Sequence, residues 1–235
     1  MPSLSPATYL DPVLFAVLPY VAVVVFFLVT IERYRRQAFS YSSLSSQFLE
    51  NKAHFYGLVP FHYGIITILA GHAAAFLIPR AILLWNGKPA RLYVLEISAL
   101  AFGLLTLIGL VAIVIRRFTD PKVKIITSAL DWVVYALLFV QVAGGVLVAI
   151  LHPWGSSWFA AAATPYLRSL VTLSPDLSAV AAMPWLVKLH IVNAWILIAI
   201  FPFSRLVHIL VTPNPYLWRR PQVVRWYRRA RARTA

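Results

Sequence analysis

The chain has 235 residues, of which 61% are hydrophobic and only 12% are charged. So few charges cannot cover the surface of a water-soluble protein, and the composition therefore indicates a protein of the lipid bilayer. Cysteine is absent, which excludes disulfides, iron-sulfur ligation and thiolate metal sites in this chain. Any redox centre must be held by histidine.

Apolar residues fall into five blocks, each about long enough to cross ~30 Å of hydrocarbon. The blocks cover residues 13–31, 58–78, 93–115, 125–151 and 185–211. We predict an all-α fold in which five transmembrane helices form one integral membrane bundle, a single domain over residues 1–235. The longest non-helical stretch is expected from about residue 152 to residue 184.

The formal net charge of +14 is divided unevenly between the two ends of these helices. Fifteen basic residues lie between the first two blocks, between the third and fourth, and in the tail at 212–235. Five lie on the opposite side: Arg80, Lys88, Arg91, Arg168 and Lys188. By the positive-inside rule the N-terminus is outside and the C-terminus is cytoplasmic.

The arginine-rich tail, RRPQVVRWYRRARAR, would suggest nucleic acid if it were taken alone. It follows a membrane helix, however, and contains the aromatic residues Trp226 and Tyr227. Anionic headgroups and an acidic partner surface each explain its charge. We therefore expect membrane lipid as a partner and no nucleic acid.

Four of the six histidines lie inside the apolar blocks, His62 and His72 in the second and His190 and His208 in the fifth. An ionisable side chain in a membrane helix normally faces the bundle interior and has a partner. Because the second and fifth helices run in opposite directions, His62 matches the depth of His208, and His72 matches that of His190. Two pairs of histidines are therefore predicted, one above the other.

The angular positions agree with this pairing only in part. At ~100° per residue, the eighteen residues from His190 to His208 make whole turns, so both would share one face of a continuous helix. The ten residues from His62 to His72 leave ~80° between them. We expect a kink at Pro202, which lacks a backbone N–H, to absorb part of the mismatch.

Two imidazoles fill both axial positions of a haem iron, which favours electron transfer over substrate binding at the iron. We therefore expect two haems of the b type, one held by His62 and His208 and the other by His72 and His190. Zinc would need three or four ligands at one point. A proton relay would normally recruit membrane carboxylates, and the spans contain only Glu96 and Asp131.

Other residues near these pairs have two interpretations. Gly64 and Gly71 would let a flat macrocycle approach the second helix, or would let another helix pack closely against it. His54 and His152 lie at the edges of spans, where an interfacial histidine needs no ligand role.

Several stretches resemble the gamma subunit, or cytochrome b subunit, of membrane-bound respiratory nitrate reductase. They are PYVAVVVFFLVTIERYR, SSQFL, FHYGIITILAGHAAAFLIP and KLHIVNAWILIAIFPFSRLVH. The number of spans and the length agree as well, while the third and fourth spans match only in hydropathy. The resemblance implies that His62 and His208 ligate the inner haem and that His72 and His190 ligate the outer one.

The resemblance further implies an oxidoreductase subunit in the cytoplasmic (inner) membrane of a prokaryote. Quinol would be oxidised near the outer haem, and electrons would pass inward to an iron-sulfur subunit and then to a molybdenum catalytic subunit. The alternatives are a quinone-reactive cytochrome b of a sulfite-reductase, heterodisulfide-reductase or nitrite oxidoreductase complex, and a transporter with histidine proton relays.

Three basic residues are candidates for ligand contacts. The family's quinol pocket uses a basic residue before the third helix, and the matching stretch RAILLWNGKPARL offers Lys88 and Arg91. We favour Arg91, which lies nearer that helix. Snorkelling to headgroups is the alternative for both. Arg205, three residues before His208, lies deep enough to need a partner, which a haem propionate or the headgroups would provide.

Overall fold

The computed structural model describes residues 10–37 and 52–210. Within these ranges five helices are long and apolar enough to cross a membrane: Leu10–Gln37, Tyr56–Leu77, Pro89–Thr119, Ala129–Leu151 and Trp185–Phe203. The predicted all-α membrane fold with five spans is confirmed. The tail at 212–235 and the SSQFL stretch lie outside the described residues.

The long helices are α2 (Leu18–Gln37), α3 (Lys52–Leu77), α5 (Pro89–Thr119), α7 (Ala129–Leu151) and α11 (Trp185–Ile200). A π-helical turn, η1 (Val13–Val17), leads into α2. The third span is longer than its predicted range, because Pro89 fits the first turn of a helix, where its missing N–H is not needed.

The predicted start of the fourth span at residue 125 is wrong. The short helix α6 (Pro121–Ile125) ends there, and α7 begins only after Ser128. The Ser128 hydroxyl accepts a hydrogen bond from the Asp131 N–H, and the Asp131 carboxylate accepts one from the Ser128 N–H. This capping box satisfies two backbone donors that a helix start leaves without partners.

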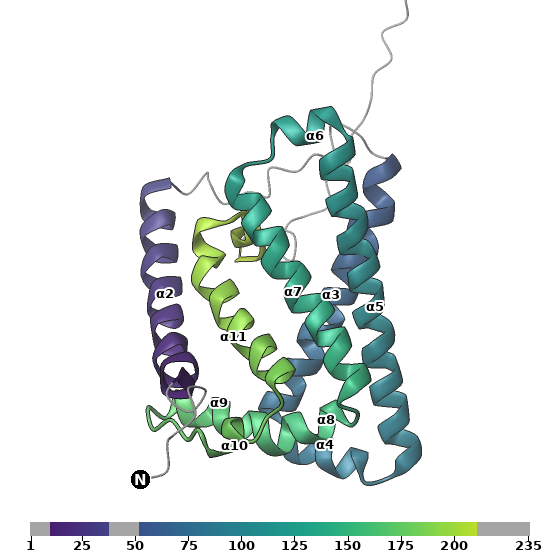
Figure 1. The fold of residues 1–235 in the computed structure, drawn as a ribbon, viewed down its shortest axis with the longest axis vertical. Helices are drawn as coiled ribbons and strands as arrows, with labels where there is room; N and C mark the ends of the chain where they lie inside the picture. Colours follow the sequence, from purple (N-terminus) through teal and green to yellow (C-terminus); the bar gives the residue numbers. More distant parts are fainter. Residues whose placement is uncertain (1–9, 38–51, 211–235) are drawn as a thin grey trace, which may run out of the picture.

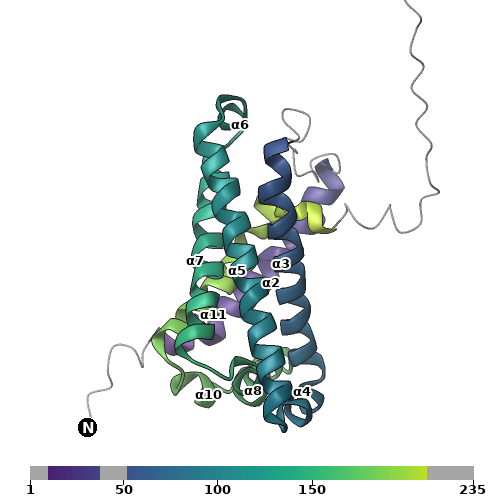
Figure 2. The ribbon, with the colours of Figure 1, turned by 90° about the vertical axis from the view of Figure 1, so that its right-hand side faces the viewer.

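The long helices pack in a row, in the order α3, α5, α7, α11 and α2. Figure 1 shows α11 between α2 and α7, and Figure 2 shows the helices side by side along the long axis. The two histidine-bearing helices, α3 and α11, are not neighbours in this row and do not pack extensively against each other.

Glycine brings α3 and α5 into close contact. A Cβ atom added to Gly109 of α5 would lie 2.8 Å from the Gly57 carbonyl oxygen of α3. One added to Gly64 would overlap the Thr106 hydroxyl and lie 2.8 Å from the Phe102 carbonyl oxygen. Small residues allow such approach between membrane helices, so Gly64 serves helix packing.

Gly71 differs from Gly64 although both lie on α3. A Cβ atom added to Gly71 would meet no other atom within 4 Å. Gly71 therefore borders open space beside His72, on the same helix that packs tightly at Gly64.

The prediction that residues 152–184 are non-helical is wrong. They form α8 (Gly155–Trp158), the π-helical turn η3 (Phe159–Ala163), α9 (Thr164–Val171) and α10 (Ser178–Ala181). Together with α4 (Pro79–Asn86) these short helices cover one end of the bundle (Figure 1). Short helices satisfy their own backbone groups, which a buried loop could not do.

Tyr166 of α9 fastens this end to the first span. Its side chain is buried, and its hydroxyl donates a hydrogen bond of 2.8 Å to the Phe15 carbonyl oxygen in η1. Burial raises the pKa of Tyr166 to about 12, so the hydroxyl keeps its proton and remains a donor.

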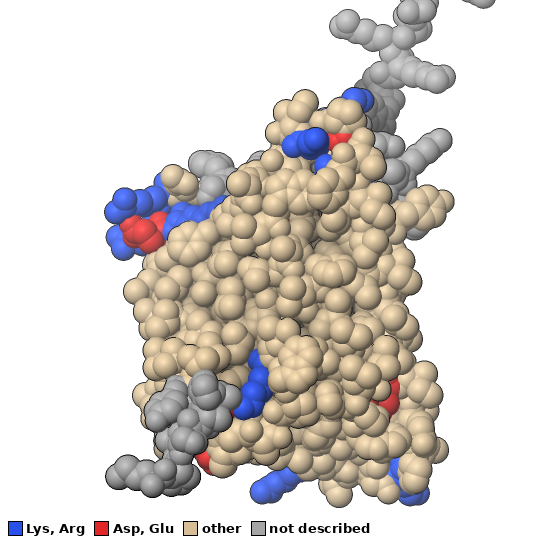
Figure 3. Space-filling model, in the orientation of Figure 1, with Lys and Arg blue, Asp and Glu red and all other residues tan. Residues whose placement is uncertain are grey.

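Charged side chains gather at the two ends of the molecule. Figure 3 shows the middle of one face almost free of Lys, Arg, Asp and Glu, as a surface in contact with lipid requires. The end with α6 carries Arg116, Arg117, Lys122 and Lys124. The inside position of this end remains a prediction from the distribution of charge.

We predict that Gly64→Ala destabilises the protein by about 1–3 kcal/mol, because its methyl group would force α3 and α5 apart. Gly103→Ala on α5 is the control and is expected to change the stability by less than ~1 kcal/mol, because its Cβ atom would meet only a Val146 side-chain methyl at 3.3 Å and alanine favours the helix. Thermal unfolding in detergent would measure both. Equal stability of the two variants would contradict the packing role of Gly64.

We predict that the N-terminus lies outside and the end with α6 lies inside. Reporter fusions at the N-terminus and in the α6 segment should show opposite locations. An N-terminal tag that becomes accessible only after the cytoplasmic side is opened would reverse this orientation.

Candidate functional site

The fifth span is not one continuous helix. The α-helix α11 ends at Ile200 and is followed by two 3₁₀ turns, η4 (Phe201–Phe203) and η5 (Arg205–Leu210). Ser204 between them is extended, with φ −95° and ψ 178°. The kink expected at Pro202 is confirmed as a break. The inference that His190 and His208 share a face of one continuous helix is wrong, because the α-helical phase stops at Ile200.

Arg33 of α2 compensates for this break. Its Nη1 donates hydrogen bonds to the carbonyl oxygens of Pro202, at 2.6 Å, and Ser204, at 3.0 Å. In a membrane such carbonyls have no water to accept from and must find a donor in the protein. The sequence suggested only headgroup or propionate contacts for an arginine in this region.

His62 and His208 lie together, with ring centres 6.3 Å apart and planes at 70°. The Nδ1 of His62 lies 2.8 Å from the Leu58 carbonyl oxygen, and that of His208 lies 2.7 Å from the Arg205 carbonyl oxygen. A carbonyl only accepts, so each Nδ1 is the donor and each Nε2 keeps its lone pair for a metal. Imidazole nitrogens bind metals at ~2 Å, which places two rings on opposite sides of one ion with centres roughly 6 Å apart.

His72 has the same arrangement on its own helix. Its Nδ1 lies 2.9 Å from the Ile68 carbonyl oxygen, which again leaves Nε2 free. The ring is exposed and contacts Phe159 of η3 edge-on, with ring centres 5.2 Å apart. Three of the four histidines are therefore oriented by a backbone carbonyl, the usual partner of the nitrogen that does not bind the metal.

His190 is the exception. Its Nε2 lies 3.1 Å from the Nε2 of Gln141 on α7, and its Nδ1 is buried without a hydrogen-bond partner among the described residues. A Cβ atom added to Gly145 would lie 3.0 Å from Cε1 of His190. The histidine spacing did not point to these α7 residues, although Gln141 is a polar residue in a strongly apolar helix.

Asn193 holds the Gln141 side chain in place. Its Nδ2 donates to Gln141 Oε1 at 2.7 Å and to the Leu137 carbonyl oxygen at 3.0 Å. Asn193 is buried and lies one turn after His190 on α11. A buried polar network therefore surrounds His190.

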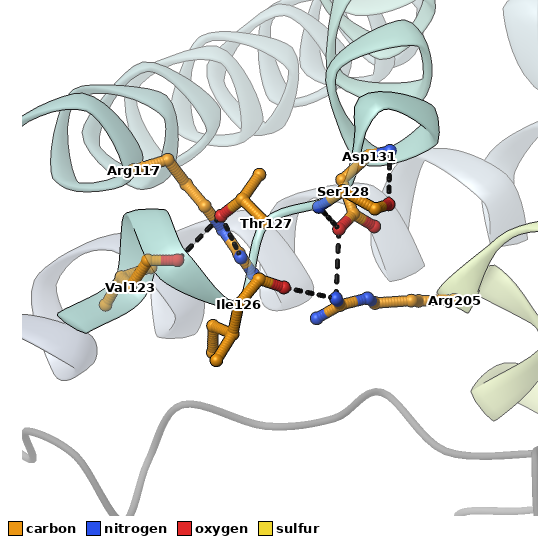
Figure 4. A network of polar contacts seen from close by, with 7 residues as sticks. All are labelled: Arg117, Val123, Ile126, Thr127, Ser128, Asp131 and Arg205. Carbon is orange, nitrogen blue, oxygen red and sulfur yellow. Dashed lines mark hydrogen bonds and ion pairs between the residues drawn. The ribbon is translucent and has the colours of Figure 1, made fainter. Parts of the chain in front are cut away.

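One terminal nitrogen of the Arg205 guanidinium makes polar contacts, and the other makes none among the described residues. Its Nη2 lies 3.0 Å from Asp131 Oδ2 and donates to the Ile126 carbonyl oxygen, as Figure 4 shows. Its Nη1 is buried and has no hydrogen-bond partner among the described residues. An arginine at the depth of Arg205 was expected to need a partner, and Asp131 is one such partner.

The two candidates for the quinol pocket differ in their surroundings. Arg91 lies with its guanidinium carbon 5.1 Å from the centre of the Trp85 ring and donates to the Leu84 carbonyl oxygen. The Trp85 indole donates back to the Arg91 carbonyl oxygen. Lys88 is exposed in the turn between α4 and α5. Arg91 therefore stabilises this turn, and Lys88 is the more available cation.

The two carboxylates inside the spans make structural contacts. Glu96 accepts hydrogen bonds from the N–H groups of Gly155 and Ser156, at 3.1 and 2.8 Å, and so holds α8. Asp131 binds Ser128 and Arg205. Neither carboxylate is free to join a histidine relay. Among the described residues no three His, Asp or Glu side chains converge as a metal site, which disfavours the zinc alternative.

The remaining two histidines, His54 and His152, are not expected to have a ligand role. His152 ends α7, and its carbonyl oxygen accepts a hydrogen bond from the Trp158 indole. The side chain of His54 lies outside the described residues.

These features define a membrane protein of five spans with two histidines on each of two spans, the second and the fifth, whose helices α3 and α11 do not pack extensively together. The family model for the nitrate reductase gamma subunit matches residues 11–227. The match covers most of the chain, and the chain therefore belongs to this family.

Curated relatives agree with this assignment. The respiratory nitrate reductase 1 gamma chain of Escherichia coli is 32% identical over 225 residues, which cover 92% of this chain and 98% of that protein. The nitrate reductase gamma chain of Bacillus subtilis is 30% identical, with 88% and 94% covered. The nitrate reductase-like protein NarX of Mycobacterium tuberculosis is 28% identical, but the aligned region spans only 32% of it.

Proposed function

We propose that this chain is the quinol-oxidising, di-haem cytochrome b subunit of a nitrate reductase in the cytoplasmic membrane of a prokaryote. In this proposal electrons pass from quinol through haems at the two histidine pairs to an iron-sulfur subunit and a molybdenum catalytic subunit. The observation that carries it is the pair His62 and His208, whose rings lie 6.3 Å apart with Nε2 free on each.

The residues of the site suit haem. Nδ1 of His190 and Nη1 of Arg205 are among the buried polar atoms that have no hydrogen-bond partner within the described residues. A haem offers an iron for imidazole and acidic propionates for guanidinium. The open space at Gly71 lies on α3 beside His72, where a flat group could approach the helix.

A haem held by these histidine pairs would supply one-electron transfer and would not need to bind substrate. The protein holds each imidazole at a set depth and orientation. Three of the rings are anchored through Nδ1 to a carbonyl of their own segment. Such anchoring fixes the tautomer and strengthens the metal-binding nitrogen.

We place quinol oxidation at the end covered by α4 and α8, beside the His72 and His190 pair. A quinol reaching this end from lipid would lose protons, and a nearby cation stabilises the oxygen that loses them. Lys88 is exposed there, whereas Arg91 is committed to Trp85. Electrons would leave from the opposite end, where the His62 and His208 pair lies.

We predict two haems of the b type per chain. His72→Ala or His190→Ala should remove the haem of one pair, and His62→Ala or His208→Ala should remove the other. A pyridine haemochrome assay counts the haems, and redox titration identifies which haem remains. His152→Ala is the control and should retain both haems. If the variants of one pair lose different haems, the pairing is wrong.

Replacement of the cation at the quinol pocket is expected to slow haem reduction without loss of haem. We predict that Lys88→Ala lowers the rate of reduction by a quinol analogue about 10²-fold, the lower range for loss of assistance to a proton transfer. Arg91→Ala should act mainly by loosening the turn between α4 and α5. Stopped-flow measurement of haem reduction tests both, and an unchanged rate for both would refute this pocket.

A further inference from the structure

His208 does not lie on the helix that carries His190. It lies on η5, a 3₁₀ segment separated from α11 by the extended residue Ser204. Hydrogen bonds of 3₁₀ turns have poorer geometry than those of an α-helix. The position of a ligand on such a segment depends on contacts from the rest of the protein.

A continuous set of contacts runs from α7 to His208. The Asp131 carboxylate is held by the Ser128 N–H at 2.8 Å and lies 3.0 Å from the Arg205 guanidinium (Figure 4). The Arg205 carbonyl oxygen accepts the hydrogen bond from His208 Nδ1 at 2.7 Å. Arg205 thereby connects the start of α7 to the ring of His208.

The ion pair is well shielded from water. The Asp131 side chain is 10% exposed and that of Arg205 is 22% exposed. Loss of one partner of a buried pair leaves the other charge uncompensated. Arg205 also donates to the Ile126 carbonyl oxygen in the segment before α7, so both contacts hold η5 against the same place.

We propose that Asp131 is a positioning residue for the haem at His62 and His208, an inference that rests on the proposed function. Its carboxylate orients the Arg205 guanidinium, fixes the Arg205 backbone to which His208 is bound, and leaves Nη1 of Arg205 available to an acidic group of the haem. Asp131 also compensates the arginine charge beside that haem. A residue that only capped α7 would not need to orient Arg205 or to compensate its charge.

The capping role and the positioning role predict different behaviour of Asp131→Asn. Asparagine keeps the shape, and its side-chain oxygen can still accept the hydrogen bond from the Ser128 N–H, but it removes the charge that compensates Arg205. The surroundings of the haem then become more positive, which favours the ferrous over the ferric iron. We expect the midpoint potential of this haem to rise by an amount that changes the ferric to ferrous ratio about tenfold, ~59 mV for one electron.

The experiment is a redox titration of the whole protein in membranes, with optical and EPR detection of each haem. Asp131→Asn should shift the haem at His62 and His208 and leave the other haem unchanged. Asp131→Glu keeps the negative charge, so its midpoint potential should stay close to that of the unmodified protein. Arg205→Gln removes a positive charge and should lower the midpoint potential. The double variant should differ from the sum of the single ones, because the two residues act as a pair.

Glu32→Gln is the matched control, because it removes the carboxylate of the exposed ion pair with Arg36 on α2 and should shift neither haem. An unchanged haem at His62 and His208 in Asp131→Asn, or an equal shift of both haems, overturns the proposal. If the Asp131→Asn protein does not accumulate, Arg205→Gln becomes the test. An unchanged midpoint potential of the haem at His62 and His208 in Arg205→Gln then overturns the proposal. Absence of both haems from the unmodified protein would instead refute the proposed function.

Discussion

A backbone carbonyl inside a membrane needs a hydrogen-bond donor from the protein, because lipid supplies none. The α-helical hydrogen bonding of the fifth span is interrupted at Pro202. Arg33 of the first span supplies the missing donor, with two hydrogen bonds to the carbonyl oxygens of residues 202 and 204. The break allows the chain to leave α11 and bring His208 beside His62. The contact between the first and fifth spans is thus a condition for the histidine pair.

The packing of the histidine-bearing helix α3 depends on where its glycines lie. Gly64 and Gly109 draw α3 onto α5, whereas Gly71 meets open space near His72. Because α3 is held by α5 and α11 by α7 and α2, the two histidine helices are supported from outside and need not pack on each other. A protein that binds a large flat cofactor between helices requires this kind of support.

The two histidine pairs have different surroundings. His62 and His208 are oriented by backbone carbonyls and lie near the charged pair of Arg205 and Asp131. His190 instead contacts the amide of Gln141, which Asn193 holds. Hydrogen bonding and charge near the axial ligands are the means by which a protein sets haem potentials. The two haems that we propose at these pairs are therefore expected to differ in potential.

The five spans, the all-helical class and the break at Pro202 follow from the sequence, because hydrocarbon thickness and the missing proline N–H act locally along the chain. The meeting of His62 and His208 was predicted from their matched depths for the same reason. The sequence did not reveal the short helices at 155–181, the α7 residues around His190, or the partners of Arg33 and Arg205. Asp131 and Arg205 are 74 residues apart, and no local pattern connects them. Only the packing of α7 against the fifth span brings this carboxylate to the arginine that precedes His208.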